Sequence, residues 1–383
     1  MNLRKIADAL GISEYPAALE QATPVNVCNL DLIESLHKEF DIFREHYDDV
    51  LQGVAALQKD ENRRIWAEYA CGYMMELPFE EAKVFPLPVK EGDSDMMPLL
   101  IQLPMIPKAV ENYRSRGFDE ETIQKMMASY YGCAKGVFNR TGKYGLDLRF
   151  HRWMLIYAKS LIFPYRGFSI EVKLFTEGAI FLKNKKDGTV VPLVQSATVH
   201  KSGLILGSAG CEDPEGSREI FCRETEDGYY GYRAVNGRIT GGEEFFSKEE
   251  WDCALRPGEF VLSVHLPKGM DLSEENVDIA FTTAIEKARV WYPEQQIRGL
   301  YCASWILDPA LVNILGENSK IVKFGNRFAR YPIKTDGQDV FRFVFPPNIT
   351  DLNDLPENTS LERGLKNLYL NGGYIYAFPG VIL

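Results

Sequence analysis

The sequence predicts an α+β protein with two domains: an all-helical N-terminal domain over residues 1–165, and a mixed, largely antiparallel sheet with helical crossovers over residues 166–383. Three observations lead to this fold class. A chain of 383 residues exceeds the usual size of one domain. Its apolar residues follow a helical period in the first part of the chain and alternate strictly afterwards. Strand, turn and helix patterns then follow one another twice between residues 258 and 330.

Four amphipathic segments make the first domain helical. Their apolar side chains recur every three or four positions, as on the buried face of a helix. Asp119 precedes one of them as an N-cap, and acidic residues follow in the first turn, where the helix dipole favours them. A proline-rich stretch over residues 77–108 is expected to connect helices. The four segments are residues 32–54, 62–75, 120–138 and 146–162.

Strand patterns replace the helical period after Gly167. Residues 168–175 alternate apolar and polar side chains, which is typical of a strand with one buried face. Asp187-Gly188 lies between two further apolar runs and predicts a hairpin turn. The other predicted strands of this type are residues 196–206, 218–224, 229–235, 340–345 and 369–378.

Two helical crossovers are predicted in the second domain. An apolar strand over residues 260–266 stops at Pro267-Lys268-Gly269, and a helix opens at Ser273. A second strand over residues 299–307 stops at Asp308-Pro309, and another helix follows. Connections this short join strands of one sheet. Both strands therefore end in turns whose backbone N–H groups can bind a phosphate-bearing ligand.

The composition argues against several classes of protein. A net charge of −11 disfavours nucleic acid or an anionic membrane as the main partner. No apolar run approaches the roughly 20 residues that span a bilayer. The N-terminal stretch is amphipathic and contains acidic residues, unlike a signal peptide with an apolar core, so a cytoplasmic location is expected. The seven cysteines are scattered singly, without CxxC pairs or histidines at metal-ligand spacing, so neither a metal site nor a disulfide framework is predicted.

Three motifs of the second domain resemble a bacterial family of acyltransferase-domain proteins: VLSVHLPKGMDLSEENVDIAF, YCASWILDPALVNIL and NSKIVKFGNRF. In that family a helical N-terminal domain precedes a domain like the GCN5-related N-acetyltransferases. The domain junction, RFHRWMLIYAKSLIFPYRGFSIE, resembles the family as well. The likeness implies an acyl-CoA-dependent transferase, with an N-acyl product expected, in which the acceptor attacks the thioester directly. The donor would be acetyl-CoA or another acyl-CoA, and neither the acceptor nor the oligomeric state follows from the sequence.

The resemblance also implies where the donor binds. The strand that ends at Val264 and Leu266 corresponds to the strand whose backbone pairs with the pantetheine arm of CoA. The turn with Lys268 and Gly269, together with the helix N-terminus at Ser273, corresponds to the site of the pyrophosphate. The second strand is expected to splay away from the first and to leave a wedge for the thioester.

Three more residues are assigned from their chemistry or position. Arg327 belongs to a run of five cations without an acid between residues 318 and 334, which suits the 3′-phosphate of CoA or an anionic acceptor. Trp305 lies on the second predicted strand and is a candidate wall of the acyl pocket. Tyr374 is similar by position to the tyrosine that protonates the CoA thiolate in acetyltransferases. Ordinary packing and solvation are the competing interpretations for all three.

Proton transfer and two alternative functions remain to be assigned. His265 lies on the first apolar strand and can take a proton from an attacking amine near neutral pH. If the strands are neighbours, His265 approaches Cys302 or Ser304, which with Asp308 forms a nucleophile–base arrangement and a covalent route. Alternatively, the domain only binds an acyl-CoA or another metabolite. A single glycine in the phosphate turn, and an acidic residue at Asp271, favour that non-catalytic alternative.

Overall fold

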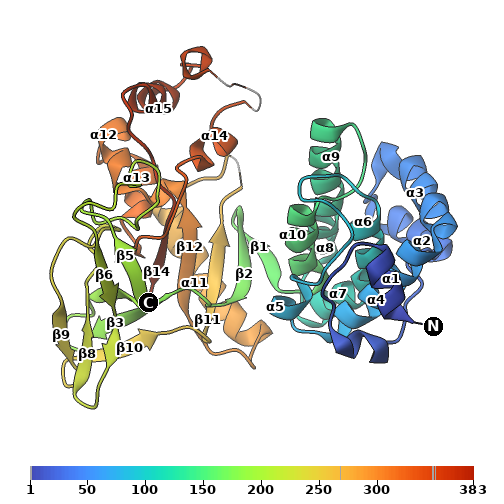
Figure 1. The fold of residues 1–383 in the computed structure, drawn as a ribbon, viewed down its shortest axis with the longest axis horizontal. Coiled ribbons are helices and arrows are strands. Elements are labelled where there is room, and N and C mark those ends of the chain that lie inside the picture. Colours follow the sequence, from blue (N-terminus) through green and yellow to red (C-terminus); the bar gives the residue numbers. More distant parts are fainter. Residues whose placement is uncertain (1, 268, 347–348, 350) are drawn as a thin grey trace. The chain divides into compact units, whose positions relative to one another are not determined.

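The computed structural model describes residues 2–267, 269–346, 349 and 351–383 (Figure 1). The chain divides into two compact units, Met1–Pro164 and Tyr165–Leu383. The first is helical and the second combines a mixed sheet with helices, so the predicted α+β fold class is confirmed. Over the described residues, no helix has the length and apolar character needed to cross a membrane.

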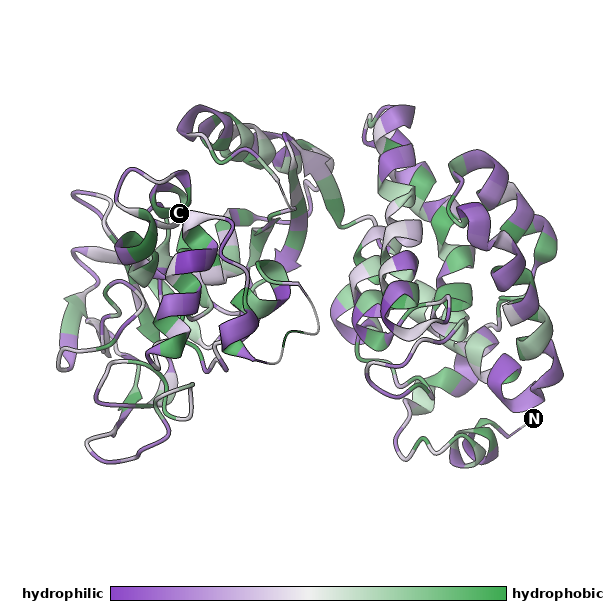
Figure 2. Cartoon of the chain, turned by 90° about the horizontal axis from the view of Figure 1, so that it is seen from above, coloured by the Kyte–Doolittle hydropathy of each residue, from purple (hydrophilic) through white to green (hydrophobic). Residues whose placement is uncertain are grey.

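The N-terminal unit is built from helices packed around one apolar core. Figure 2 shows hydrophilic and hydrophobic residues alternating around these helices, as expected where one face of each helix is buried. The indole of Trp66 is fully buried in the core and donates a hydrogen bond to the carbonyl of Pro86 (3.1 Å). The helices are α1 Leu3–Ala9, α2 Leu30–Phe40, α3 Tyr47–Lys59, α4 Glu61–Glu76, α5 Phe79–Ala82, α6 Met97–Gln102, α7 Ile106–Ser115, α8 Glu120–Met127, α9 Ser129–Thr141 and α10 Leu148–Ala158.

The single helix predicted over residues 32–54 is wrong. Helix α2 ends at Phe40. The next residue, Asp41, adopts a left-handed conformation (φ 51°), and Arg44 does the same (φ 48°) before α3 begins. Non-glycine residues rarely adopt this conformation inside a helix. The segment predicted over residues 120–138 is also divided, into α8 and α9, whereas Asp119 caps α8 as predicted, its carboxylate accepting from the N–H of Thr122 (2.8 Å).

A buried polar network joins three helices of the N-terminal unit. The amide of Gln102 donates to both Nδ1 and the carbonyl oxygen of His151, each at 2.8 Å. The hydroxyl of Tyr130 in turn donates to the amide oxygen of Gln102 (3.1 Å). Burial lowers the pKa of His151 to about 4. The imidazole is therefore neutral in the folded protein near neutral pH.

The C-terminal unit contains a six-stranded sheet in the order β1-β2-β11-β12-β14-β13 (Figure 1). Strands β11 and β12 are parallel and are joined through α11, which confirms the first predicted crossover. The other neighbouring pairs with a described register (β2–β11, β12–β14 and β14–β13) are antiparallel. The strands are β1 Ile162–Tyr165, β2 Phe168–Leu174, β11 Phe260–His265, β12 Ile297–Ser304, β13 Ala329–Arg330 and β14 Phe378–Ile382.

Smaller sheets lie between β2 and β11 in the chain. The predicted hairpin is confirmed: β3 and β4 are antiparallel, and Gly188 in their turn has a left-handed φ of 74°, which glycine adopts without strain. The three smaller sheets have the orders β10-β3-β4, β5-β6 and β7-β8-β9. Their strands are β3 Ala179–Asn184, β4 Val190–Val194, β5 Ser196–Val199, β6 Arg218–Phe221, β7 Arg223–Glu224, β8 Gly228–Gly231, β9 Glu244–Ser247 and β10 Trp251–Leu255.

Each face of the six-stranded sheet packs against a different layer. On one face the ring of Phe168 lies 5.4 Å from that of Phe281 in α11. On the other face Val261 and Tyr301 share a core with Phe181 of β3. The helices of this unit are α11 Glu274–Trp291, α12 Val312–Leu315, α13 Lys320–Gly325, α14 Asp339–Phe343 and α15 Ser360–Leu370.

Two segments predicted as strands have other structures, one mainly helical and one mainly irregular. Residues 340–345 overlap α14, and residues 369–378 contain the end of α15 and an irregular segment before β14. Helix α15 begins with a capping box, in which the hydroxyl of Thr359 accepts from the N–H of Glu362 (3.1 Å) and the carboxylate of Glu362 accepts from the N–H of Thr359 (2.7 Å). These reciprocal bonds satisfy the first donors of the helix and favour it over a strand.

Candidate functional site

The parallel strands β11 and β12 separate toward their C-terminal ends. Their Cα pairing ends at Ser263 and Tyr301. Beyond that point β11 stays paired with β2 as far as His265, and β12 stays paired with β14 as far as Ser304. Each strand thus follows its outer neighbour, and the distance between the two must exceed the usual spacing of about 4.8 Å. We call this opening, bounded by Val264–His265 and Cys302–Ser304, the wedge.

The alternation of side chains assigns the residues of the wedge to opposite faces of the sheet. Val264 pairs with Ile170, which shares a face with Phe168 and therefore with α11. His265 lies on the other face. Because Ser263 pairs with Tyr301, Cys302 and Ser304 lie on the α11 face, opposite to His265. The predicted approach of His265 to Cys302 or Ser304 is therefore contradicted by the register.

His265 is instead paired with Glu171 of β2. Its Nε2 lies 2.7 Å from a carboxylate oxygen of Glu171. The Glu171 side chain is 7% exposed, whereas the His265 side chain is 33% exposed and can be reached from solvent. Glu171 is not among the predicted site residues, because the alternation in residues 168–175 places it at a polar position typical of the solvent-facing side of a strand. The proximity of two residues 94 positions apart needs the strand register.

The other residues of the predicted covalent route have structural roles. Cys302 is 1% exposed, and burial raises the pKa of its thiol to about 12, which disfavours the reactive thiolate. The hydroxyl of Ser304 accepts from the N–H of Ile306 (3.4 Å). Asp308 is buried and accepts from the N–H groups of Ala310 (2.8 Å) and Tyr376 (2.7 Å). Burial raises the pKa of Asp308 as well.

The turn after β11 contains a glycine with free space around it, Gly269, and an acidic residue, Asp271. Gly269 has a left-handed φ of 81°, and the space around its Cα is open. Ser273 occupies the N-cap position of α11, but its hydroxyl donates to Asp271 (2.7 Å) instead of capping the helix. The N–H of Ser273 also donates to Asp271 (3.0 Å). Lys268 lies outside the described residues, and Leu266 precedes the turn.

Three of the predicted cations pair with acidic residues of α11 and its approach. Bonds from Ser273 and then Lys320 lower the pKa of Asp271 to about 2. On each side of these pairs the residues are three or four positions apart, as on one face of a helix, so the pairs connect α13 to α11. They are Lys320–Asp271 (3.0 Å), Lys323–Glu274 (2.5 Å) and Arg327–Asp278. The local excess of positive charge expected from the sequence is therefore largely neutralised, and Arg327 has an internal partner.

The aromatic candidates lie near the ends of β12 and β14. Trp305 is buried in a short 3-10 turn, Trp305–Leu307, so the strand predicted to reach residue 307 stops at Ser304. Tyr374 is half-buried and lines a cavity of about 360 Å³ together with Phe341 and Tyr369.

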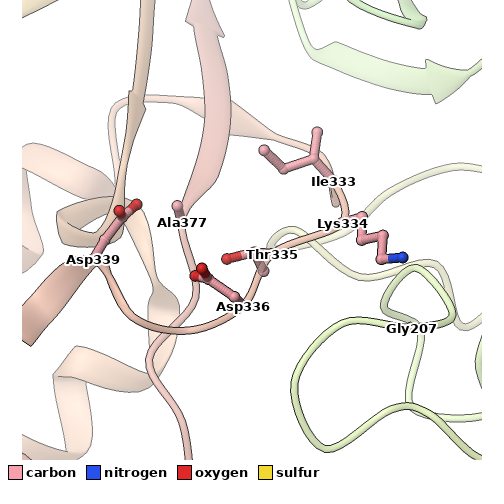
Figure 3. Close-up of a pocket in the computed structure, with 7 residues that line it drawn as sticks. All are labelled: Gly207, Ile333, Lys334, Thr335, Asp336, Asp339 and Ala377. Atoms are coloured by element: carbon pink, nitrogen blue, oxygen red, sulfur yellow. The ribbon is translucent and has the colours of Figure 1, made fainter. Parts of the chain in front are cut away.

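A second cavity, of about 340 Å³, lies at the start of β14 (Figure 3). Ala377 lines it and directly precedes Phe378, which pairs with Ser304, so this cavity adjoins the same end of the sheet as the wedge. In Figure 3 the side chain of Lys334 runs toward Gly207. The cavity is lined by Gly207, Ile333, Lys334, Thr335, Asp336, Asp339 and Ala377.

Comparisons with known proteins agree with this geometry. Residues 187–382 match the family model described as a GNAT-like C-terminal domain. The comparison with curated proteins gives no match. The crystal structure of an acyltransferase in complex with decanoyl-CoA and teicoplanin is 16% identical, with a TM-score of 0.59 over 100% of this chain and 99% of that chain. That of an acyltransferase mutant in complex with octanoyl-CoA is 15% identical, with a TM-score of 0.60 over the same shares.

The matched segment includes both strands of the wedge, the turn after β11 and the helices α11 and α13. The solved structures share the fold along the whole chain, helical unit included. The resemblance found in the sequence motifs is thereby confirmed, and the chain belongs to the family of proteins with a GNAT-like C-terminal domain.

Proposed function

We propose that this protein transfers the acyl group of an acyl-CoA to the amine of an acceptor by direct attack on the thioester. The observation that carries the proposal is the separation of β11 from β12 in a GNAT-like domain, with the His265–Glu171 pair at the mouth of the wedge. The solved structures of similar fold hold octanoyl-CoA or decanoyl-CoA, which supports an acyl-CoA as donor. We expect the reaction to take place in the cytoplasm.

The donor would lie along β11 and across the turn that follows it. Backbone groups of Val264 and Leu266 would bind the pantetheine arm, since β12 has left this edge of β11. Lys268, Gly269 and the N–H groups near Ser273 would bind the pyrophosphate, because a helix N-terminus favours anions. Trp305 would form one wall of the pocket for the acyl chain. Arg327 would give up its ion pair with Asp278 and bind the 3′-phosphate of CoA instead.

In the transfer step the acceptor nitrogen forms a bond to the thioester carbonyl carbon. The C–S bond breaks, and its electron pair goes to the CoA sulfur. His265 takes the proton that the amine loses, and Tyr374 supplies a proton to the thiolate. Both side chains return to their starting states by exchange with solvent. Backbone N–H groups of β11 at the wedge would stabilise the negative charge that develops on the carbonyl oxygen.

The acceptor would approach from the side of the wedge that carries His265. The cavity at the start of β14 adjoins this end of the sheet, and it combines the ammonium of Lys334 with the carboxylates of Asp336 and Asp339. We propose that polar groups of the acceptor bind there. The cavity adjoins β14, and β12 lies between β14 and β11. Because neighbouring strands are about 4.8 Å apart, the acceptor must extend over two strand spacings to reach β11.

A non-catalytic binding protein is the second candidate, and one observation favours it. The carboxylate of Asp271 accepts from the N–H of Ser273 and from the ammonium of Lys320, groups that would otherwise face a phosphate. A bound pyrophosphate would meet that negative charge. Binding of CoA and turnover with an amine, measured separately, distinguish the two candidates.

Calorimetric titration of the purified protein with CoA, acetyl-CoA, octanoyl-CoA and decanoyl-CoA tests the donor site. We expect binding, and at 100 times the dissociation constant a stabilisation of about 2.7 kcal/mol in thermal unfolding. Substitution of Gly269 by alanine strains the left-handed turn and should weaken binding. Gly258→Ala is the matched control, since Gly258 has a left-handed φ of 94° and equally open surroundings at the other end of β11.

Release of free CoA thiol in the presence of a panel of amines then separates enzyme from binding protein. Thiol release that depends on the amine, with a matching acylated product, supports the transferase. Tight binding of acyl-CoA without turnover on any amine favours the binding protein. The absence of binding to all four CoA compounds would refute the transferase and would leave a protein that binds another metabolite.

A further inference from the structure

The Glu171–His265 pair carries an inference that rests on the proposed function and extends it. We propose that Glu171 is a positioning residue: it holds the proton of the neutral imidazole on Nε2, so that Nδ1 of His265 takes the proton of the acceptor. Neither Glu171 nor the choice of ring nitrogen follows from the sequence motifs.

The geometry of the pair determines which nitrogen is protonated. An ionised carboxylate can only accept hydrogen bonds, so the ring nitrogen that faces it must carry a proton. That nitrogen is Nε2, at 2.7 Å from the carboxylate of Glu171, a distance typical of charge-assisted hydrogen bonds. In neutral His265 the lone pair is therefore on Nδ1, the atom that can act as a base.

The strands give both residues a fixed position. The Cα of Glu171 is opposite Ser263 and that of His265 is opposite Ser169 in the antiparallel pair β2–β11, so their side chains lie on the same face of the sheet. Glu171 is buried, and its position is fixed by the hydrogen-bonded strands on which both residues lie. A base held on rigid elements is already oriented before the substrate arrives.

Other charged groups on this face of the sheet pair with one another. Lys173, the next residue of β2 on the same face, has its ammonium 3.1 Å from Glu177 and 4.4 Å from the ring centre of Tyr301. The hydroxyl of Tyr301 also donates to Glu177 (3.0 Å). These groups form a separate cluster farther along the strands, and Glu171 is the carboxylate within hydrogen-bonding distance of His265.

The pair has a consequence for the step in which the proton moves. When the acceptor nitrogen bonds to the thioester carbon, its proton passes to Nδ1 and His265 becomes a cation. The carboxylate of Glu171 then faces a full positive charge, and their hydrogen bond strengthens because both partners are charged. Glu171→Gln keeps an oxygen for Nε2–H but removes the charge, whereas Glu171→Leu removes both.

Kinetics of four variants test this role. We expect kcat to fall about 10-fold in Glu171→Gln and about 100-fold in Glu171→Leu, within the range that general-base catalysis contributes, while the dissociation constant of CoA stays the same. In the His265→Gln background, adding Glu171→Leu should lower kcat no further, because both residues act through one proton transfer. Losses that multiply in this double variant would show that Glu171 acts independently of His265 and would overturn the proposal.

Asp49→Asn is the matched control. Asp49 pairs with His46 at the same distance of 2.7 Å, but in the N-terminal unit. Its removal should leave kcat unchanged. If Asp49→Asn lowers kcat as much as Glu171→Gln, the loss follows from general destabilisation and the proposal fails.

Nitrogen NMR of the protein labelled at its five histidines tests the tautomer without any substrate. The signals of His265 are identified by their loss in His265→Gln. Neutral His265 should be protonated at Nε2 in the wild type and in Glu171→Gln, and should become a mixture of tautomers in Glu171→Leu. A wild-type ring protonated at Nδ1 would overturn the proposal even if the protein transfers acyl groups. If no transfer is found, the proposed function fails and this measurement still decides the tautomer.

Discussion

Acid should destabilise the N-terminal unit through His151, and the size of the effect follows from its surroundings. Burial lowers the pKa of His151 from an ordinary value of 6.5 to about 4. As pH falls below 6.5, the unfolded chain binds a proton that the folded chain excludes, so stability is lost on the acid side and is fully present above pH 6.5. Between pH 7 and pH 5 the loss is about 2 kcal/mol, since each pH unit in this window is worth about 1.4 kcal/mol.

Urea unfolding followed by far-ultraviolet circular dichroism measures this loss, because the helical unit dominates the signal. The comparison is with His151→Asn, whose amide can replace Nδ1 as partner of Gln102 but does not titrate. The variant should be less stable at both pH values, yet it should lose about 2 kcal/mol less than the wild type between them. Other titrating groups contribute equally to both proteins and cancel in the difference. Equal losses in wild type and variant would refute the assignment of the effect to His151.

Three further predictions concern the donor turn, the helix packing and the buried thiol. Asp271→Asn should strengthen CoA binding several-fold in calorimetric titration, because it removes the carboxylate from the pyrophosphate position; unchanged or weaker binding would contradict that placement. Gly72→Ala in α4 should destabilise the protein strongly, since the added Cβ would lie 1.9 Å from the carbonyl oxygen of Thr23. Gly136→Ala in α9, where the space is open, should instead stabilise by about 0.5–1 kcal/mol. Cys302→Ala should keep kcat within about twofold, and a 100-fold loss would restore the covalent route.

Local signals in the sequence were sufficient for much of the fold. The hairpin turn at Asp187-Gly188 and the β11–α11–β12 crossover each depend on short-range patterns that no later contact overrides. Helix α15 is not predicted, although its capping box is a local signal, because the Asn-Gly-Gly run that follows it favours a turn between strands. The break after α2 depends on the left-handed conformation of Asp41. An aspartate tolerates this conformation, but its presence in a sequence does not predict it.

Only part of the candidate site can likewise be predicted from the sequence. His265 stands out in the sequence as a histidine on an apolar strand, and the wedge follows from the family resemblance. Glu171 depends on the register between β2 and β11, which brings together residues 94 positions apart. Arg327 belongs to a run of cations that is visible in the sequence. Its ion pair with an acidic residue of α11 is a tertiary contact, which the sequence does not show. Charge in a sequence indicates a surface, and only the packing shows what neutralises it.

The separation of β11 from β12 also affects how the sheet holds together. The six strands form two groups of three, β1-β2-β11 and β12-β14-β13, joined along a short seam that ends at Ser263 and Tyr301. The register across this seam pairs fewer residues than the register between β2 and β11 or between β12 and β14, so fewer backbone bonds hold the two groups together than hold these neighbours. A donor that pairs with the free edge of β11 would connect the two halves of the sheet. Binding of the donor should therefore slow amide hydrogen exchange on both sides of the seam.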